Sequence, residues 1–105
     1  MKTEKTKPES IWWLYMIRTR LDSIYTGIST DVERRFTEHS SDSKKGARSL
    51  KGKGPLKLLL KRKIGSKSMA SKVEWHIKHL TKLQKENLVK GKLKWKIALE
   101  KFSHK

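Results

Sequence analysis

The sequence predicts a small α+β domain in which a three-stranded sheet, antiparallel or mixed, is flanked by three or more helices. Two stretches rich in aromatic and β-branched residues, 11–18 and 23–28, are separated by a short polar link and indicate an antiparallel hairpin. A third apolar stretch at 56–64 indicates another strand, and helical patterns follow the second and third strands. The expected order is therefore β-β-α-β-α-α, and 105 residues suffice for one such domain.

The two predicted hairpin strands each carry one of the two tyrosines of the chain, Tyr15 and Tyr25. If the turn is symmetric about Arg20, the tyrosines lie directly opposite each other on one sheet face, with Cβ atoms roughly 5 Å apart. Core packing is the common explanation for a tyrosine in a strand. A buried phenol still needs a hydrogen-bond partner, so the pair is also a candidate for a functional site.

The second strand leads into a helix predicted at about 31–40. Thr30 and Glu33 have the spacing of a capping box, which would start this helix. Arg34 is expected to point toward Glu38 as a surface ion pair. One helix face carries apolar residues together with an arginine and a histidine: Val32, Arg35, Phe36 and His39. These two polar residues are candidates for a site, the alternative being an arginine that extends to solvent and a partly exposed histidine.

The later elements follow from the same patterns. Alternation in the third strand predicts that one face carries Leu56, Leu58, Leu60 and Ile64. A helix is predicted at 67–80, with inward residues Met69, Val73, Ile77 and Leu80. Thr81 and Gln84 form a second capping box, which starts a short helix that ends near Gly91.

The two ends of the chain are expected to lie outside the folded domain at 11–91. Residues 1–10 contain Lys, Glu and Pro with nothing to bury, which is typical of a disordered tail. Residues 92–105 form a basic C-terminal extension whose pattern fits a strand or a helix equally. The N-terminus lacks the apolar core of a signal peptide, and no run of eighteen apolar residues is present. We therefore expect no membrane partner.

Positive charge dominates the composition, with 27 Lys and Arg against 10 Asp and Glu and a net charge of +17. Such a charge repels itself, and nucleic-acid phosphates would relieve that repulsion. The alternative is a lysine-rich chain whose charge only keeps it in solution. The absence of cysteine excludes disulfides, thiol catalysis and cysteine zinc sites, and it is compatible with a reducing cytoplasm, where we expect the protein.

The long segment at 40–55 is a candidate for nucleic-acid binding. It contains three glycines, which would let the backbone approach a phosphate. Its five basic residues are Lys44, Lys45, Arg48, Lys51 and Lys53. The alternative is an ordinary flexible loop in solvent.

Glu74 is the only acidic residue between Asp42 and Glu86, and it borders the apolar stripe of the predicted helix at 67–80. In a structural role, Glu74 would form an ion pair with Lys78 one turn later. In a functional role, its carboxylate would bind a hard divalent cation, with water and phosphate oxygens completing the coordination.

Several motifs in the right order together resemble the signature of GIY-YIG endonucleases. They are Leu14-Tyr15, Tyr25-Thr26-Gly27, the segment 30–39, Lys45-Gly46-Ala47-Arg48 and the helix that bears Glu74. The tyrosines are ten residues apart, and Arg35 follows the second tyrosine by ten. The resemblance covers residues 11–90 and is closest to the small stand-alone bacterial members, the YhbQ-like group. The chain departs from the pattern at Trp13-Leu14-Tyr15, at Thr26, and at Ile28, where some members have a basic residue.

The resemblance implies hydrolysis of DNA with Mg²⁺ or Mn²⁺ as the cofactor and no small-molecule cofactor. The implied catalytic residues are Tyr15, Tyr25, Arg35, His39 and Glu74. Glu74 would hold the metal against the scissile phosphate, and Arg35 would donate to the developing charge. Tyr15, deprotonated or relayed through His39, would help to activate the attacking water, and Tyr25 would hydrogen-bond the phosphate or that water.

Two functions are compatible with these observations. The first is an endonuclease that acts in DNA repair or recombination or on foreign DNA, with branched or structured DNA among its substrates. The alternative is a non-catalytic protein that retains the fold and binds structured DNA or RNA. Joint retention of the five implied catalytic residues favours the first, because a pure binder needs none of them. Substrate structure, the preferred metal and the oligomeric state stay open.

Overall fold

The computed structural model of the protein describes residues 10–41 and 46–96. Its strands are β1 (Trp12–Arg18), β2 (Ile24–Ser29) and β3 (Lys57–Gly65), and its helices are α1 (Val32–Ser40), α2 (Lys67–Lys78) and α3 (Lys82–Val89). A short 3-10 segment, η1 (Arg48–Leu50), precedes β3. The α+β class and the order β-β-α-β-α-α are confirmed. The expected tail and most of the C-terminal extension fall outside the described residues.

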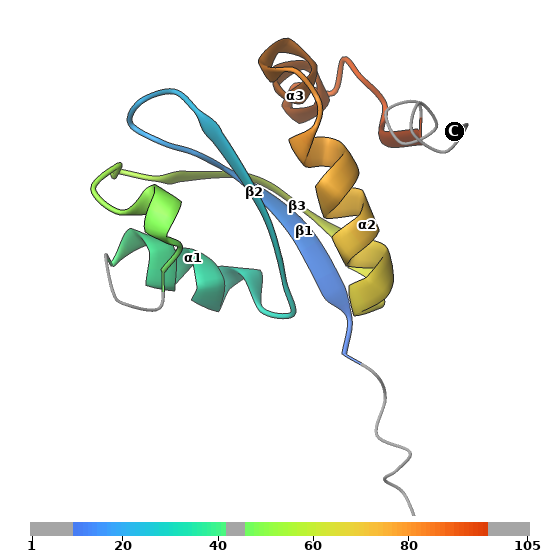
Figure 1. Ribbon diagram of the computed structural model, residues 1–105, viewed down its shortest axis with the longest axis horizontal. Helices are drawn as coiled ribbons and strands as arrows, with labels where there is room; N and C mark the ends of the chain where they lie inside the picture. The colour runs from blue at the N-terminus through green and yellow to red at the C-terminus, as the bar shows by residue number, and fades with distance from the viewer. Residues whose placement is uncertain (1–9, 42–45, 97–105) are drawn as a thin grey trace, which may run out of the picture.

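The three strands form one antiparallel sheet in the order β2-β1-β3, with β1 in the centre (Figure 1). Successive side chains of a strand point to opposite faces of the sheet. Leu14 and Met16 of β1 accordingly pack in the hydrophobic cluster that includes the buried residues of α2. Tyr15 and Ile17 pack in a second cluster with Val32 of α1. Helices α1 and α2 therefore cover opposite faces of the sheet.

The expectation that the apolar residues of β3 share one face of the sheet is wrong, because β3 contains a β-bulge. Met16 of β1 pairs with Leu60, but the next residue, Ile17, pairs with Leu58, so Leu59 is the extra residue. The bulge reverses the alternation at this point. Leu56 and Leu58 consequently join the α1 side of the sheet, whereas Leu60 and Ile64 join the α2 side.

The hairpin turn is centred on Leu21, not on Arg20. A link of five residues joins β1 to β2, and it is closed by the Thr19 N–H, which donates to the Ser23 carbonyl at 3.0 Å. Asp22 occupies the left-handed region at φ 65°, a conformation that Asp tolerates better than most residues. The shift of the centre by one residue changes every cross-strand pair from the expected register.

Helix α1 starts one residue later than expected. Asp31 is the N-cap, and its carboxylate accepts a hydrogen bond from the Arg34 N–H at 3.1 Å. The predicted capping box of Thr30 and Glu33 is therefore wrong. The Glu33 side chain instead forms an ion pair with Lys61 of β3. An Asp at the N-cap satisfies a free N–H and also places negative charge at the positive end of the helix dipole.

Helix α2 packs across the sheet through Ala70, Val73 and Ile77, all of them buried. Ser66 is its N-cap, with the Ser66 hydroxyl accepting from the Met69 N–H at 3.1 Å. The expected inward position of Met69 is wrong, because this side chain is 54% exposed and Ala70 faces the core in its place.

Helix α3 begins with the predicted capping box. The Thr81 hydroxyl accepts from the Gln84 N–H, and the Gln84 side chain accepts from the Thr81 N–H. Gly91 has φ 81° just after the helix, as a C-terminal glycine often does. Arg18 at the end of β1 binds both carboxylate oxygens of Glu86 at 2.7 Å, which ties α3 to the sheet and lowers the pKa of Glu86.

Candidate functional site

The sheet face under α1 brings three of the candidate residues together. Tyr15 Oη lies 3.0 Å from His39 Nε2. The centre of the Tyr25 ring lies 6.2 Å from the centre of the Tyr15 ring and 5.4 Å from the centre of the His39 ring. Tyr15 is 1% exposed and His39 is 3% exposed, so the alternative of a partly exposed histidine is wrong. We call these three residues, together with Arg35, the aromatic cluster.

The two tyrosines share a face of the sheet, as expected. The expectation that they lie directly opposite each other is wrong. Tyr15 pairs with Gly27, and Tyr25 pairs with Ile17. The phenols are therefore diagonal neighbours across β1 and β2, a separation that aromatic side chains can bridge. This diagonal arrangement leaves room for the His39 ring to contact both tyrosines.

Gly27 makes the position of the Tyr15 ring possible. A Cβ atom at this residue would lie 2.5 Å from Tyr15 Oη and 2.6 Å from the ring carbon that bears it. The Tyr15 ring is thus folded across β2, where only a residue without a side chain leaves space. Buried as it is, the ring has little freedom to move away.

Arg35 extends the cluster along α1. Its Nη1 lies 2.9 Å from the Glu38 carboxylate, and its side chain is 31% exposed. Its charge and hydrogen bonding act on Tyr15, where they lower the pKa of the phenol. Arg34, by contrast, is 65% exposed, and its guanidinium lies 4.0 Å from the Asp31 carboxylate. The expected pair between Arg34 and Glu38 is therefore wrong, since Arg35 is the partner of Glu38.

Burial raises the pKa of the Tyr15 phenol well above its ordinary value, and the neighbouring Tyr25 raises it further. The opposing influence of Arg35 does not offset these two effects. Tyr15 therefore keeps its proton at neutral pH. The expectation of a deprotonated Tyr15 that activates water finds no support in this environment.

His39 is held at both ring nitrogens. Nε2 faces Tyr15 Oη, and Nδ1 accepts a hydrogen bond from the Ala47 backbone N–H at 2.9 Å. Burial lowers the pKa of His39, and the nearby Arg35 charge lowers it further, against a smaller opposing influence of Glu38. The ring is therefore neutral at physiological pH. The contribution of Ala47 had no signal in the sequence, because any residue except proline carries this N–H.

Glu74 lies on α2, over the other face of the sheet from the aromatic cluster. Its carboxylate is 3.1 Å from the Lys78 ammonium group, the ion pair that the structural role predicts, and its side chain is 22% exposed. Within residues 10–41 and 46–96, no group of three acidic, histidine or cysteine residues could hold a metal ion. Glu74 thus offers one partly exposed carboxylate, which fits Mg²⁺ only if water and phosphate oxygens supply the other ligands.

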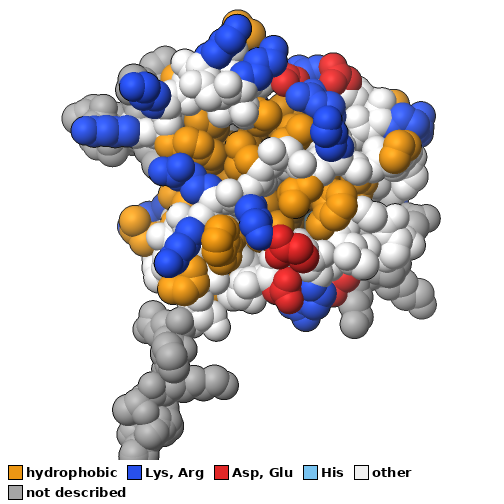
Figure 2. Space-filling model, turned by 180° about the vertical axis from the view of Figure 1, so that it is seen from behind, with side chains coloured by type: hydrophobic (Ala, Val, Ile, Leu, Met, Phe, Trp, Pro, Cys, Tyr) orange, Lys and Arg blue, Asp and Glu red, His pale blue; other side chains and the backbone are white. Residues whose placement is uncertain are grey.

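The candidate nucleic-acid-binding segment is fastened to the hairpin turn. Arg20 donates from its side chain to the carbonyls of Gly52 at 2.9 Å and Gly54 at 3.1 Å, and its N–H donates to the Lys53 carbonyl. Arg48 and Lys51 are exposed and Lys53 is half-buried, whereas Lys44 and Lys45 lie outside the described residues. Other Lys and Arg side chains are spread around apolar patches on the face shown in Figure 2. No described helix is long and apolar enough to cross a membrane.

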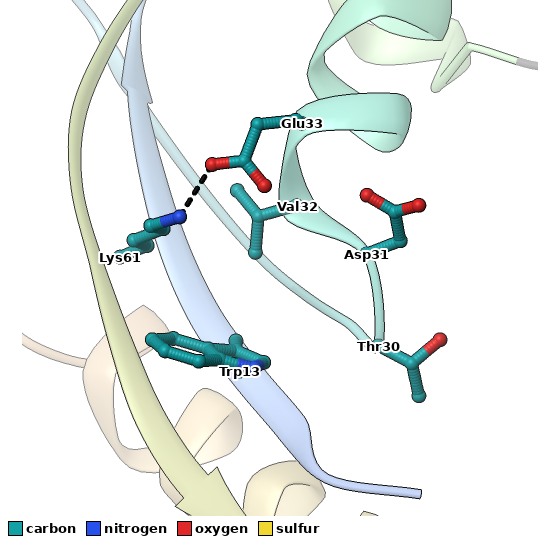
Figure 3. A pocket seen from close by; sticks show the side chains of 6 residues that line it. All are labelled: Trp13, Thr30, Asp31, Val32, Glu33 and Lys61. Carbon is teal, nitrogen blue, oxygen red and sulfur yellow. Dashed lines mark hydrogen bonds and ion pairs between the residues drawn. The ribbon is translucent and has the colours of Figure 1, made fainter.

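A cavity of about 120 Å³ opens at the start of α1 (Figure 3). It is lined by Trp13, Thr30, Asp31, Val32, Glu33 and Lys61. The carboxylates of Asp31 and Glu33 would repel a phosphate, and Lys61 is already paired with Glu33.

Comparison with known proteins shows similarity over most of the chain. The family model described as the GIY-YIG catalytic domain matches residues 11–87. A UPF0213 protein of Enterobacter sp. (strain 638) is 52% identical over 80 residues, 76% of each chain. The UPF0213 protein YhbQ of Escherichia coli (strain K12) is 51% identical over 78 residues, 74% of this chain and 76% of that one. The solution NMR structure of a UPF0213 protein from Bacillus halodurans is 35% identical, covers 89% of this chain and 97% of that chain, and gives a TM-score of 0.51.

The packing of Tyr15 on Gly27 predicts the effect of Gly27→Ala. The added methyl group would displace the Tyr15 ring and lower the free energy of unfolding by about 1–3 kcal/mol, the usual cost of overpacking. Urea denaturation measures the loss, and NMR shifts of the Tyr15 ring report the displacement. The control is Gly54→Ala, whose Cβ would meet its nearest neighbour at 3.8 Å. Equal stability of the two variants would contradict the close packing.

Proposed function

The chain belongs to the GIY-YIG nuclease family, and on this premise we propose that it is a metal-dependent endonuclease that hydrolyses phosphodiester bonds in DNA. The observation that carries the proposal is the convergence of Tyr15, Tyr25, Arg35 and His39 in one cluster. Binding to nucleic acid alone would not require two phenols and a buried neutral histidine around an arginine.

Arg35 is the residue of the cluster best suited to contact the scissile phosphate. Its guanidinium carries only donors, in a planar arrangement that matches two phosphate oxygens. It is partly buried, so its interaction with developing negative charge is less screened than that of an exposed arginine. Glu38 holds it in place from the same helix. Stabilisation of charge by such a fixed donor is a major source of catalysis.

Tyr25 is the phenol that would meet the substrate. It is half-buried, whereas Tyr15 is almost completely enclosed. The Tyr25 hydroxyl is proposed to hydrogen-bond the phosphate or the attacking water. Tyr15, which keeps its proton, acts through its neighbours, because its ring and hydroxyl set the positions of Tyr25 and His39. Tyr15 is thus a positioning residue in this account.

Glu74 is the proposed metal-binding residue, for Mg²⁺ or Mn²⁺. When bound, such an ion supplies Lewis-acid stabilisation of the phosphate and of the leaving oxygen. Strand β2 is an edge strand that both α1 and α2 contact (Figure 1). A DNA strand that lies across the β2 edge would meet Arg35 from one side and Glu74 from the other.

The net charge of +17 supports a nucleic-acid substrate and favours tight binding to phosphates. We propose DNA, including branched or structured DNA, with a role in repair or recombination or in the destruction of foreign DNA. One observation favours the alternative of a binder without activity: Glu74 lies over the other sheet face and is paired with Lys78. The variants below separate the two functions.

If Arg35 contacts the phosphate, Arg35→Ala will lower the rate of DNA cleavage by about 10²–10³-fold, the usual effect of removing one donor to a developing charge. The matched control is Arg34→Ala, which removes an exposed arginine from the same helix. We expect the control to cut within a few-fold of the parent in a single-turnover assay. Equal losses in the two variants would show that bulk charge, and not the position of Arg35, supports cleavage.

The test of the function itself is Glu74→Gln, which keeps the size of the side chain and removes its charge. Cleavage should fall to background while DNA binding persists or tightens, because one carboxylate no longer repels the phosphates. Lys78→Gln is the control, since it breaks the same ion pair and leaves the carboxylate. Loss of that exposed pair should cost about 0.3–0.5 kcal/mol and leave cleavage near the parental rate.

The outcome that would end the metal-dependent proposal is a folded Glu74→Gln protein that cuts at the parental rate in Mg²⁺. Circular dichroism verifies the fold of both variants, and a filter-binding assay verifies that each still binds DNA. A parent protein that binds DNA tightly and cuts none of the tested DNAs with any metal would instead favour the non-catalytic binder.

A further inference from the structure

The hydrogen bonds at the two nitrogens of His39 determine where the ring carries its proton. A backbone N–H can only donate, so the contact from Ala47 at 2.9 Å requires a lone pair on Nδ1. A neutral imidazole has one protonated and one unprotonated nitrogen, so Nε2 bears the hydrogen. Nε2 lies 3.0 Å from Tyr15 Oη, and it therefore donates to the phenol oxygen.

The approach of Ala47 to His39 depends on the residue before it. A Cβ atom at Gly46 would lie 2.8 Å from the Glu38 carbonyl oxygen and 3.1 Å from the Cα of His39. Both atoms belong to the backbone of α1 and cannot move aside cheaply. Glycine at 46 thus lets the chain pass against the last turn of the helix, where the next N–H points at His39 Nδ1.

We infer that the backbone amide of Ala47 is a positioning group that holds His39 as the neutral Nε2–H tautomer and makes Tyr15 the acceptor in the Tyr15–His39 hydrogen bond. The sequence resemblance implies a relay in which His39 draws the proton from Tyr15. The geometry reverses this direction, because Nε2 has no lone pair to receive a proton. The catalytic role of this hydrogen bond rests on the proposed nuclease function. The assignment of the tautomer does not depend on that function.

The direction of the hydrogen bond also determines where the Tyr15 proton goes. Tyr15 Oη accepts from His39 and receives the influence of Arg35, which carries only donors. The Tyr15 hydroxyl is then left to donate toward the neighbouring Tyr25 phenol, toward water or toward an oxygen of the bound substrate. The neighbouring Tyr25 also raises the pKa of Tyr15, so the Tyr15 hydroxyl keeps its proton. The cluster then transmits polarisation from Ala47 through His39 and Tyr15 toward the partly exposed Tyr25.

The variant that removes this N–H and little else replaces the Ala47 amide by an ester, with L-lactate at position 47 in place of alanine (Ala47→lactate). Ala47 has φ −65° and ψ 136°, an extended conformation that the ester keeps together with the methyl group. Its carbonyl, which accepts from the Leu50 N–H, is retained. Ala47→Gly is the complementary control, because it removes the alanine methyl group but keeps the N–H.

The first measurement uses the full-length parent and needs no variant. Long-range ¹H–¹⁵N correlation spectra of the His39 ring distinguish a protonated from an unprotonated nitrogen. We expect Nδ1 to be unprotonated and Nε2 to be protonated in the parent and in Ala47→Gly. A parent ring with a proton on Nδ1 would overturn the inference, whether or not the protein cuts DNA.

The second measurement concerns the ester variant, Ala47→lactate. Without the donor at Nδ1, we expect His39 to sample both tautomers and to gain a proton at a higher pH than in the parent. The charged and titratable groups that face this ring are Tyr15, Tyr25, Arg35 and Glu38, and the variant leaves all four in place. If Ala47→lactate keeps the parental tautomer and titration, the amide does not hold the ring, and the inference is wrong.

Cleavage kinetics connect the tautomer to the reaction. We expect Ala47→lactate to lower kcat by about 10-fold or more with little change in KM. An altered tautomer with parental kcat would show that the amide has no role in catalysis. A parent with the expected tautomer and no activity would refute the nuclease proposal while the assignment of His39 stands, so the two failures are distinguishable.

Discussion

The hydrogen bond between Tyr15 and His39 is the contact on which the candidate site depends. It joins the central strand of the sheet to the last turn of α1 in a buried setting, where an unpaired polar group costs several kcal/mol. Its partners are satisfied only because two glycines permit close approach. Gly27 leaves space for the Tyr15 ring, and Gly46 brings the Ala47 amide to the other side of His39. The site is therefore assembled from four separate segments around one polar contact.

The sequence was sufficient to predict the class and order of the elements, because apolar periodicity and the Thr81 capping box are local signals. It was insufficient for register. The hairpin turn is centred on Leu21, a detail decided by hydrogen bonds within the turn. The bulge at Leu59 also reverses the faces of β3, and no local pattern distinguishes it from regular alternation. At α1, two residues compete for the N-cap, and Asp31 prevails over Thr30 because its carboxylate also suits the helix dipole.

Helical periodicity correctly separated the residue that joins the aromatic cluster, Arg35, from the exposed Arg34. The pairing of the tyrosines on one face was also predictable, although their diagonal offset was not. Long-range contacts that pass through the backbone left no trace in the sequence. One such contact is the hydrogen bond from the Ala47 amide to His39. Another is the hydrogen bond from the Arg20 side chain to the Gly52 carbonyl, which holds the basic segment against the hairpin. Both depend on three-dimensional approach and not on the identity of a neighbour in the chain.

The proposed site has a buried, neutral Tyr15–His39 pair with the charged Arg35 on one face of the sheet and the single Glu74 carboxylate over the other face, within a strongly basic chain. The central claim is that this arrangement cuts DNA with the help of a divalent metal. The most direct measurement is incubation of the purified parent chain with branched, single-stranded and duplex DNA, in Mg²⁺, in Mn²⁺ and in EDTA. The account predicts cleavage of at least one of these DNAs with a metal and none in EDTA. Intact DNA under every metal condition, or equal cleavage in EDTA, would contradict it.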